Sequence, residues 1–280
     1  MNPLVLLAEE HHDPFRHTWN TWELDLYVVK LNLRAIPMFE TLGITNNVVM
    51  LFVVAIVLLT IGIKAGNEAK RALAQGRTPR GLGHVIEIFV EFIREQMVKP
   101  QMPHHFKNGF LNAYFCTLFF FILACNLIGL APAPFGHSPT GMFVLNAALA
   151  FGFTFLVIIG SGFAEHGPKW IWTGFVPHGV PFWIAPLIWV IEIVGTVIKP
   201  FSLTIRLTAN MTAGHIILAV LLGFLTAEID SAVVKGLVLS ASGFGYLAIT
   251  AFEIAIAFIQ AYIFTMLSAV FVGMSLSHEH

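Results

Sequence analysis

The residues best suited to chemistry lie inside the apolar carboxyl-terminal third of this 280-residue chain. Arg206 stands near the middle of the almost uninterrupted apolar run 182–224. A charge at the centre of a membrane helix costs at least about 2.5–3.5 kcal/mol on insertion scales, so such residues usually mark function. Ser202 and Asn210 each lie four residues from Arg206, so the three side chains share one helix face. This face predicts a fixed positive charge flanked by hydrogen-bonding groups.

Further charged residues extend this face, and a second apolar run carries a similar row. Glu192 and Lys199 precede Arg206 at intervals of seven residues and lie on the same side of the helix. We predict that Glu192 and Lys199 belong to an access path or an interface rather than to the centre. In the run 233–276, Glu253 and Gln260 are again seven residues apart. Two helices thus each present a polar stripe on an otherwise apolar surface.

Antiparallel packing of the two runs would bring these stripes together. In an antiparallel helix pair, the numbers of facing residues have a constant sum. That sum is 468 for His215 with Glu253 and 466 for Arg206 with Gln260, so both pairs fit one register. A histidine beside a carboxylate in a polar pocket can exchange protons near neutral pH. We therefore predict that His215 and Glu253 form a proton relay and that Gln260 faces Arg206.

A purely structural reading of these residues is also open. Polar stripes can hold membrane helices together by hydrogen bonds, which would account for the amides and the serine. They do not account for Arg206, because no acidic residue lies within one turn of it on its own helix. The pair of His215 and Glu253 could likewise serve only to fix the hairpin.

The composition requires that these residues work in a lipid environment. The chain is 57% hydrophobic and only 11% charged, and its mean hydropathy is +0.79. A soluble domain usually carries about 25% charged residues, so one water-soluble core cannot hold this much apolar surface. The formal net charge of −1 argues against nucleic acid as a partner. Neither Cys116 nor Cys125 has the spacing of a metal site or a disulfide framework, and we predict no metal and no cofactor.

The hydrophobic pattern predicts an all-α integral membrane protein with five spans and one amphipathic surface helix. Residues 1–45 are expected to form a tail outside the cytoplasm, and residues 46–280 a single membrane domain. The surface helix is expected at 82–98, where apolar and charged residues occupy opposite faces. The spans are expected at 46–64, 109–130, 142–164, 182–224 and 233–276.

The last two runs are too long for simple spans. A helix of 43 residues would be roughly 64 Å long, whereas the hydrocarbon core is about 30 Å thick. Breaking each run into two spans would require an internal polar loop, and neither run contains one. We therefore predict a hairpin of two long, strongly tilted helices.

Basic residues predict the orientation of the chain. A loop after the first span is expected to hold five of them, which marks that side as cytoplasmic. They are Lys64, Lys70, Arg71, Arg77 and Arg80. The amino terminus is then extracytoplasmic, and the carboxyl end 277–280 is cytoplasmic.

Three segments resemble a known family. Residues 199–215, with the sequence KPFSLTIRLTANMTAGH, closely resemble the most characteristic stretch of the a subunit of F-type ATP synthases. Residues 252–264 match a second motif of that family, and residues 126–132, NLIGLAP, match a third, weaker one. The resemblance extends over roughly residues 40–280.

The resemblance implies a membrane stator without catalytic activity of its own. In this family, two offset half-channels lead protons to the carboxylates of a rotating c-ring, and Arg206 matches the arginine that separates the channels. Asn210 and Gln260 match residues beside that arginine, and Ser202 shares its face. The expected partners are the c-ring, the peripheral-stalk b subunits and the lipid of a bacterial inner membrane. Nucleic acid is not expected, nor is any small substrate other than the translocated ion.

Two departures from the family pattern concern the outer half-channel. The resemblance implies that His215 and Glu253 line it, but the histidine and the acid stand in exchanged positions relative to some bacterial members. The exchange keeps one base and one acid at the same two places. Near Met142 much of the usual polarity is missing, and only Thr140 and Asn146 remain as polar candidates.

Other functions make distinguishable predictions. An ion-coupled secondary transporter would show inverted repeats, and none is apparent. A haem protein needs deep histidines on facing helices, but only His215 lies deep in a span. A structural subunit leaves Arg206 unexplained. A sodium-coupled variant of the same motor stays open.

Overall fold

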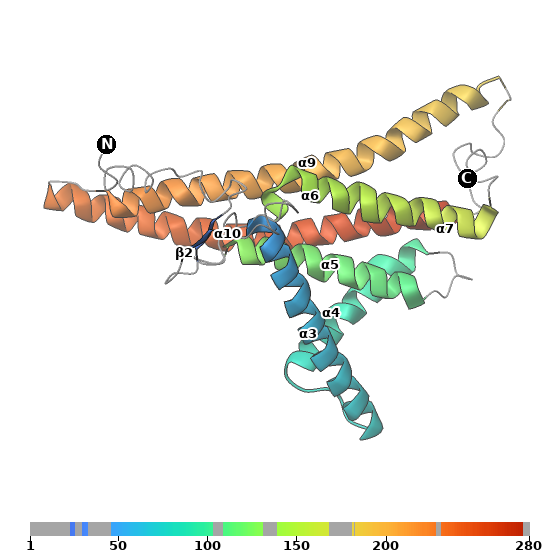
Figure 1. Ribbon diagram of the computed structural model, residues 1–280, viewed down its shortest axis with the longest axis horizontal. Helices are drawn as coiled ribbons and strands as arrows, with labels where there is room; N and C mark the ends of the chain where they lie inside the picture. The colour runs from blue at the N-terminus through green and yellow to red at the C-terminus, as the bar shows by residue number, and fades with distance from the viewer. Residues whose placement is uncertain are drawn as a thin grey trace. The chain divides into compact units, whose positions relative to one another are not determined.

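The computed structural model describes residues 23–25, 30–32, 46–102, 109–130, 139–167, 181, 183–227 and 231–276. In this part of the chain, five helices are long and apolar enough to cross a membrane, which confirms the predicted all-α membrane fold (Figure 1). Two short antiparallel strands, β1 (Glu23–Asp25) and β2 (Lys30–Asn32), were not predicted within the tail. The rest of the tail lies outside the described residues, as do residues 131–138, 168–180, 228–230 and the carboxyl end 277–280.

The first span is longer than the sequence predicts. Helix α3 covers Asn46–Ala74 rather than 46–64, so Lys64, Lys70 and Arg71 lie on a helix and not in a loop. The added segment is rich in alanine, lysine and arginine, which favour helix. The connection begins only near Gly76, whose φ of 62° ends the helical path.

The predicted amphipathic helix at 82–98 is present, with an internal change of geometry. Helix α4 covers Leu82–Phe92, a π-helix follows at Ile93–Val98, and a 3-10 turn ends the segment at Lys99–Gln101. Lys99 donates a 2.8 Å hydrogen bond to Glu95, and this bond lowers the pKa of the partly exposed Glu95 carboxyl below its usual range.

The middle spans lie close to their predicted positions. Helix α5 covers Gly109–Leu130. The third span follows a short 3-10 turn at Pro139–Gly141 and is not a uniform α-helix. It begins as α6 (Phe143–Ala147), continues as a π-helix at Ala148–Phe155 and ends as α7 (Leu156–His166).

The last two helices are uninterrupted, as predicted. Helix α9 covers Ala185–Thr226 and contains Pro200 without a break, and α10 covers Ala232–Leu276. With 42 and 45 residues they are about 63 and 68 Å long. Both are about twice as long as the hydrocarbon core is thick.

The chain forms two compact units, and each long helix contributes to both. The first unit comprises residues 1–53, 125–142 and 207–258, and includes the closed end of the α9–α10 hairpin. There, Leu221 and Leu225 of α9 lie over Gly245 and Gly243 of α10. The numbers of these facing residues sum to 466 and 468, so the predicted register is the one observed in this unit.

The second unit comprises residues 54–124, 143–206 and 259–280. Its fully buried side chains include Met97, Phe115, Ile122 and Phe264. The end of the amphipathic segment lies directly against α10, because a Cβ on Gly273 would overlap the carbonyl oxygen of Gln101. This close contact fixes the carboxyl end of the segment to the last helix.

Candidate functional site

Arg206 lies on an exposed face of α9 in the second unit. Its side chain and that of Ser202 are exposed, and the neighbouring Phe201 and Ile205 are 48% and 44% exposed. No carboxylate among the described residues forms an ion pair with Arg206. Because a lipid-facing arginine is costly, an exposed cation on an apolar helix face requires a carboxylate or water from outside the described structure.

Asn210 continues this row one turn further along α9. Its side chain is half-buried, and the amide nitrogen Nδ2 is buried without a hydrogen-bond partner in the described part of the chain. Buried amide groups are nearly always hydrogen-bonded, so an exception requires an explanation.

Glu253 is the most unusual side chain of the first unit. It is 5% exposed, and its oxygen Oε2 is buried without a hydrogen-bond partner among the residues that the structure describes. A Cβ added to Gly214 of α9 would lie 2.5 Å from the carboxylate carbon of Glu253. The carboxylate therefore lies where a side chain at position 214 would be. The next residue of α9 is His215, which is half-buried.

Gln260 is buried on α10, with 7% of its surface exposed. In the same unit, Lys199 of α9 lies over the ring of Phe271 of α10, with 4.8 Å between Nζ and the ring centroid. If this antiparallel register continues by seven residues, Arg206 lies opposite Phe264, and Gln260 lies one turn from that position. The predicted pairing of Arg206 with Gln260 stays a prediction.

Glu192 and Lys199 contact each other on α9. Their charged groups are 4.0 Å apart, and both side chains are more than one third exposed, so the pair contributes little to stability. The ring contact with Phe271 gives Lys199 a second neighbour, which limits its freedom to reach an interface. The role of the pair in an access path or interface stays a prediction.

Asn146 is fully buried at the start of the third span. Its backbone carbonyl accepts a 3.5 Å hydrogen bond from the hydroxyl of Thr204, which also donates to the carbonyl of Pro200 at 2.9 Å. In the second unit, the segment that precedes Arg206 is therefore bound to the third span. Phe143 and Phe201 pack edge to face beside this bond, with 6.4 Å between ring centroids.

Two features of the site were missed by the sequence reasoning. Thr140 donates a 2.8 Å hydrogen bond to Asn126, and both residues are fully buried in the first unit. Asn126 was noted only as part of a motif, although a lone amide in the apolar run 115–130 was a signal. Nothing in the sequence around Gly214 indicates its role, because a glycine is required there only by the Glu253 carboxylate of the opposite helix.

Comparison with known proteins identifies the family. Residues 48–273 match the family described as ATP synthase A chain. A relative named ATP synthase subunit a from Chloroherpeton thalassium is 39% identical over 242 residues, which cover 85% of this chain and 68% of the relative. ATP synthase subunit a 2 of Chlorobaculum tepidum is 40% identical over 252 residues, covering 87% of this chain and 67% of that protein. ATP synthase subunit a of Anaeromyxobacter dehalogenans is 38% identical, with 84% and 58% covered. This chain, with its exposed arginine on a long membrane helix, therefore belongs to the ATP synthase A chain family, the a subunits of the F-type synthase.

Proposed function

We propose that this chain is the stator through which protons reach and leave the rotating c-ring of an F-type ATP synthase. Family membership supports a proton-channel role within that complex. The observation that carries the finer proposal is the exposed Arg206, which has no carboxylate partner among the described residues. Each passing c subunit would supply a carboxylate that forms an ion pair with Arg206. The chain itself catalyses no reaction in this proposal.

Arg206 acts as a fixed barrier between two half-channels. A proton moving down the membrane potential releases about 2.3 kcal/mol per 100 mV, and this energy is captured only if the path is broken inside the membrane. A fixed cation at the break repels an excess proton and favours the ionised form of a nearby ring carboxylate. Arginine suits this role because it stays charged when it is desolvated, whereas lysine can lose its proton.

His215 and Glu253 are the titrating groups that we assign to the outer half-channel. Glu253 lies seven residues, or about 10 Å, before Gln260 along α10. Any side chain at position 214 would overlap the Glu253 carboxylate, so Gly214 is a positioning residue for the relay. Asn210 lies between His215 and Arg206 along α9, and Ser202 continues the polar row one turn beyond Arg206.

The apolar surface around Arg206 is the proposed c-ring face. Phe201 and Ile205 of α9 and Ile259 and Tyr262 of α10 are 39–54% exposed in the second unit. Such a surface fits lipid or an apolar helix, and only a helix that carries a carboxylate also matches Arg206. We further propose contact with peripheral-stalk b subunits and a place in a bacterial inner membrane, with an extracytoplasmic amino terminus and a cytoplasmic carboxyl end.

The test is Arg206→Ala in the complete synthase. ATP synthesis driven by a proton gradient should fall to background in membrane vesicles, while the variant chain still co-purifies with the c-ring. Lys235→Ala is the matched control, because Lys235 is an exposed cation on α10 that the mechanism does not use. Retention of coupled synthesis by the Arg206→Ala complex would contradict the proposal. Repeating the assay with and without sodium separates a proton motor from a sodium motor.

A further inference from the structure

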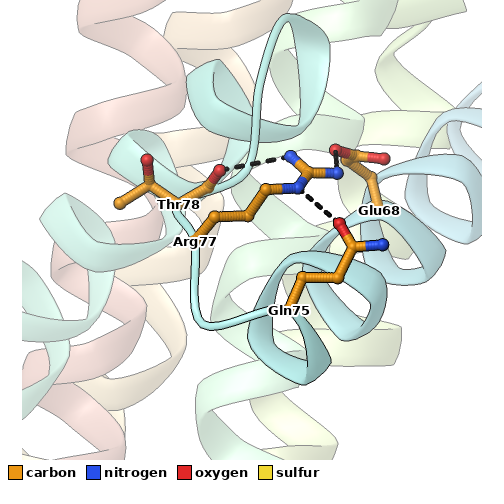
Figure 2. Close-up of polar contacts among 4 residues, drawn as sticks. All are labelled: Glu68, Gln75, Arg77 and Thr78. Atoms are coloured by element: carbon orange, nitrogen blue, oxygen red, sulfur yellow. Dashed lines mark hydrogen bonds and ion pairs between the residues drawn. The ribbon is translucent and has the colours of Figure 1, made fainter.

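The connection between α3 and α4 is a well-defined corner that the proposed mechanism does not use. We call residues 64–85 the α3–α4 corner. Figure 2 shows that Arg77 donates hydrogen bonds to the side chain of Gln75 at 2.7 Å, the carbonyl of Thr78 at 3.4 Å and the carboxylate of Glu68 at 3.2 Å. A Cβ on Gly83 would lie only 3.1 Å from Glu68 Cγ, so α4 begins directly against α3. The corner therefore holds its shape through contacts within the chain.

The corner carries a strong positive charge. It contains five basic residues and one acidic residue, and the acid, Glu68, is already paired with Arg77. The other four cations are exposed, and none forms an ion pair with any residue of the described ranges. They are Lys64, Lys70, Arg71 and Arg80. Four like charges in one short segment favour a partner with negative charge.

The position of Lys70 along α3 shows where that partner lies. Ile56, Leu59 and Ile63 are 62%, 65% and 55% exposed and form an outward stripe on α3. Lys70 follows Ile63 by seven residues on the same stripe, about 10 Å further along the axis. The polar headgroup layer lies just beyond the hydrocarbon core, which is about 30 Å thick. A stripe that faces acyl chains therefore brings Lys70 to the headgroups.

Exposed apolar side chains accompany the cations. Leu73, Leu82 and Val85 are 83%, 70% and 50% exposed within the corner. Cations interleaved with exposed leucines are typical of surfaces that bind anionic membranes, because the leucines enter the boundary region while the cations bind phosphate. Since α3 is itself a candidate span, the corner at its end lies at the boundary of the membrane, where it can meet lipid headgroups. Binding of an acidic protein would not explain why the exposed apolar stripe of α3 continues directly to Lys70 in the corner.

We propose that the α3–α4 corner binds the headgroups of anionic phospholipids in the leaflet where α3 ends. Lys70, Arg71 and Arg80 contact the phosphates, and Leu73 and Leu82 enter the boundary beside them. The proposal is independent of the proton path and of the direction in which the chain crosses the membrane.

The experiment compares lipid preference in the full-length chain. Wild-type protein and the K70Q/R71Q/R80Q variant are reconstituted in phosphatidylcholine vesicles, and spin-labelled phosphatidylglycerol or phosphatidylcholine reports the lipid held at the protein. Each cation near the surface adds up to about a fivefold preference at low salt. The wild type should therefore prefer phosphatidylglycerol, and the variant should lose at least about half of that preference. Salt should weaken the preference of the wild type.

Two further variants define the site. Leu73→Gln keeps the charge and should weaken the preference less than the triple variant, while K70R/R71K should retain it. The control K235Q removes an exposed cation of α10 and should have no effect. An unchanged preference in the triple variant, or an equal loss in K235Q, overturns the proposal. So does a triple variant that keeps its lipid preference but loses b subunits from the purified synthase, because that result indicates protein docking. Circular dichroism checks that each variant is folded.

Discussion

Two sets of buried polar side chains differ in how fully their hydrogen bonds are formed. In the second unit, Thr154 and Ser161 of the third span meet Ser268 and Ser275 of α10, with 3.4 and 2.8 Å between hydroxyl oxygens. We call these four residues the hydroxyl seam. Both pairs differ by 114 in residue number, so the two helices run parallel there. In the first unit, Glu253 Oε2 and Asn210 Nδ2 are equally buried but have no hydrogen-bond partner among the described residues.

We interpret the difference as one between residues that hold helices together and residues that we propose to carry function. Every hydroxyl of the seam also lies within hydrogen-bond distance of a backbone carbonyl of its own helix, such as Ser268 of Phe264 at 2.8 Å and Ser161 of Ile158 at 3.0 Å, so in each pair one hydroxyl can donate to its own helix while the other donates across. Such satisfied groups cost little and join helices in a membrane. An acid and an amide whose hydrogen bonds are incomplete cost stability, and they are retained where they serve a function. If this comparison is right, substitutions in the two sets should affect different properties.

The largest expected effect in the relay comes from exchanging its two side-chain types. Glu253→His and His215→Glu, made singly, place two bases or two acids at one site and should slow proton translocation roughly tenfold or more. The double exchange H215E/E253H restores one acid and one base and should recover part of the rate. ATP-driven acidification of inverted vesicles measures all four proteins. A double variant slower than both single variants would falsify the relay.

A smaller loss is expected from Gly214→Ala. The added methyl would collide with the carboxylate of Glu253, so that carboxylate must leave its present position against α9. We expect proton translocation to fall severalfold while the amount of chain in the membrane stays close to the wild-type level. Gly223→Ala on the same helix is the matched control, because nothing in the described structure lies within 4 Å of a Cβ there. Equal rates for the two variants would show that the space at Gly214 is not required.

The sequence predicted much of this arrangement because charges in apolar runs are conspicuous. The uninterrupted helices follow from the lack of an internal polar loop, and the types and spacing of Arg206, Glu253 and Gln260 make them candidate site residues, which stays a prediction. The constant residue sum also predicted the register of the closed end of the hairpin. Each of these conclusions depends only on residues of a single helix or of one antiparallel helix pair.

What could not be predicted depends on contacts between distant segments. Serine and threonine occur in many membrane helices, so nothing in the sequence distinguishes Ser268 as the partner of Thr154. The extension of α3 to Ala74 differs from the predicted end at residue 64, because charges after an apolar run suggest a loop, whereas charged residues with high helix propensity readily continue a helix. The space at Gly214 depends on a side chain of the opposite helix.

The smallest expected effect belongs to the hydroxyl seam. Ser161→Ala, Ser275→Ala and the double variant remove one interhelical hydrogen bond of 2.8 Å. Such bonds in membrane proteins contribute about 0.6 kcal/mol on average, so the coupling energy of the double-mutant cycle should have about that size. Unfolding of the purified chain in mixed detergent micelles measures this energy, and the vesicle assay should show unchanged proton translocation. A clear loss of translocation without a loss of stability would place the seam on the proton path. In that case, complete hydrogen bonding would no longer distinguish the structural residues of this chain from its functional ones.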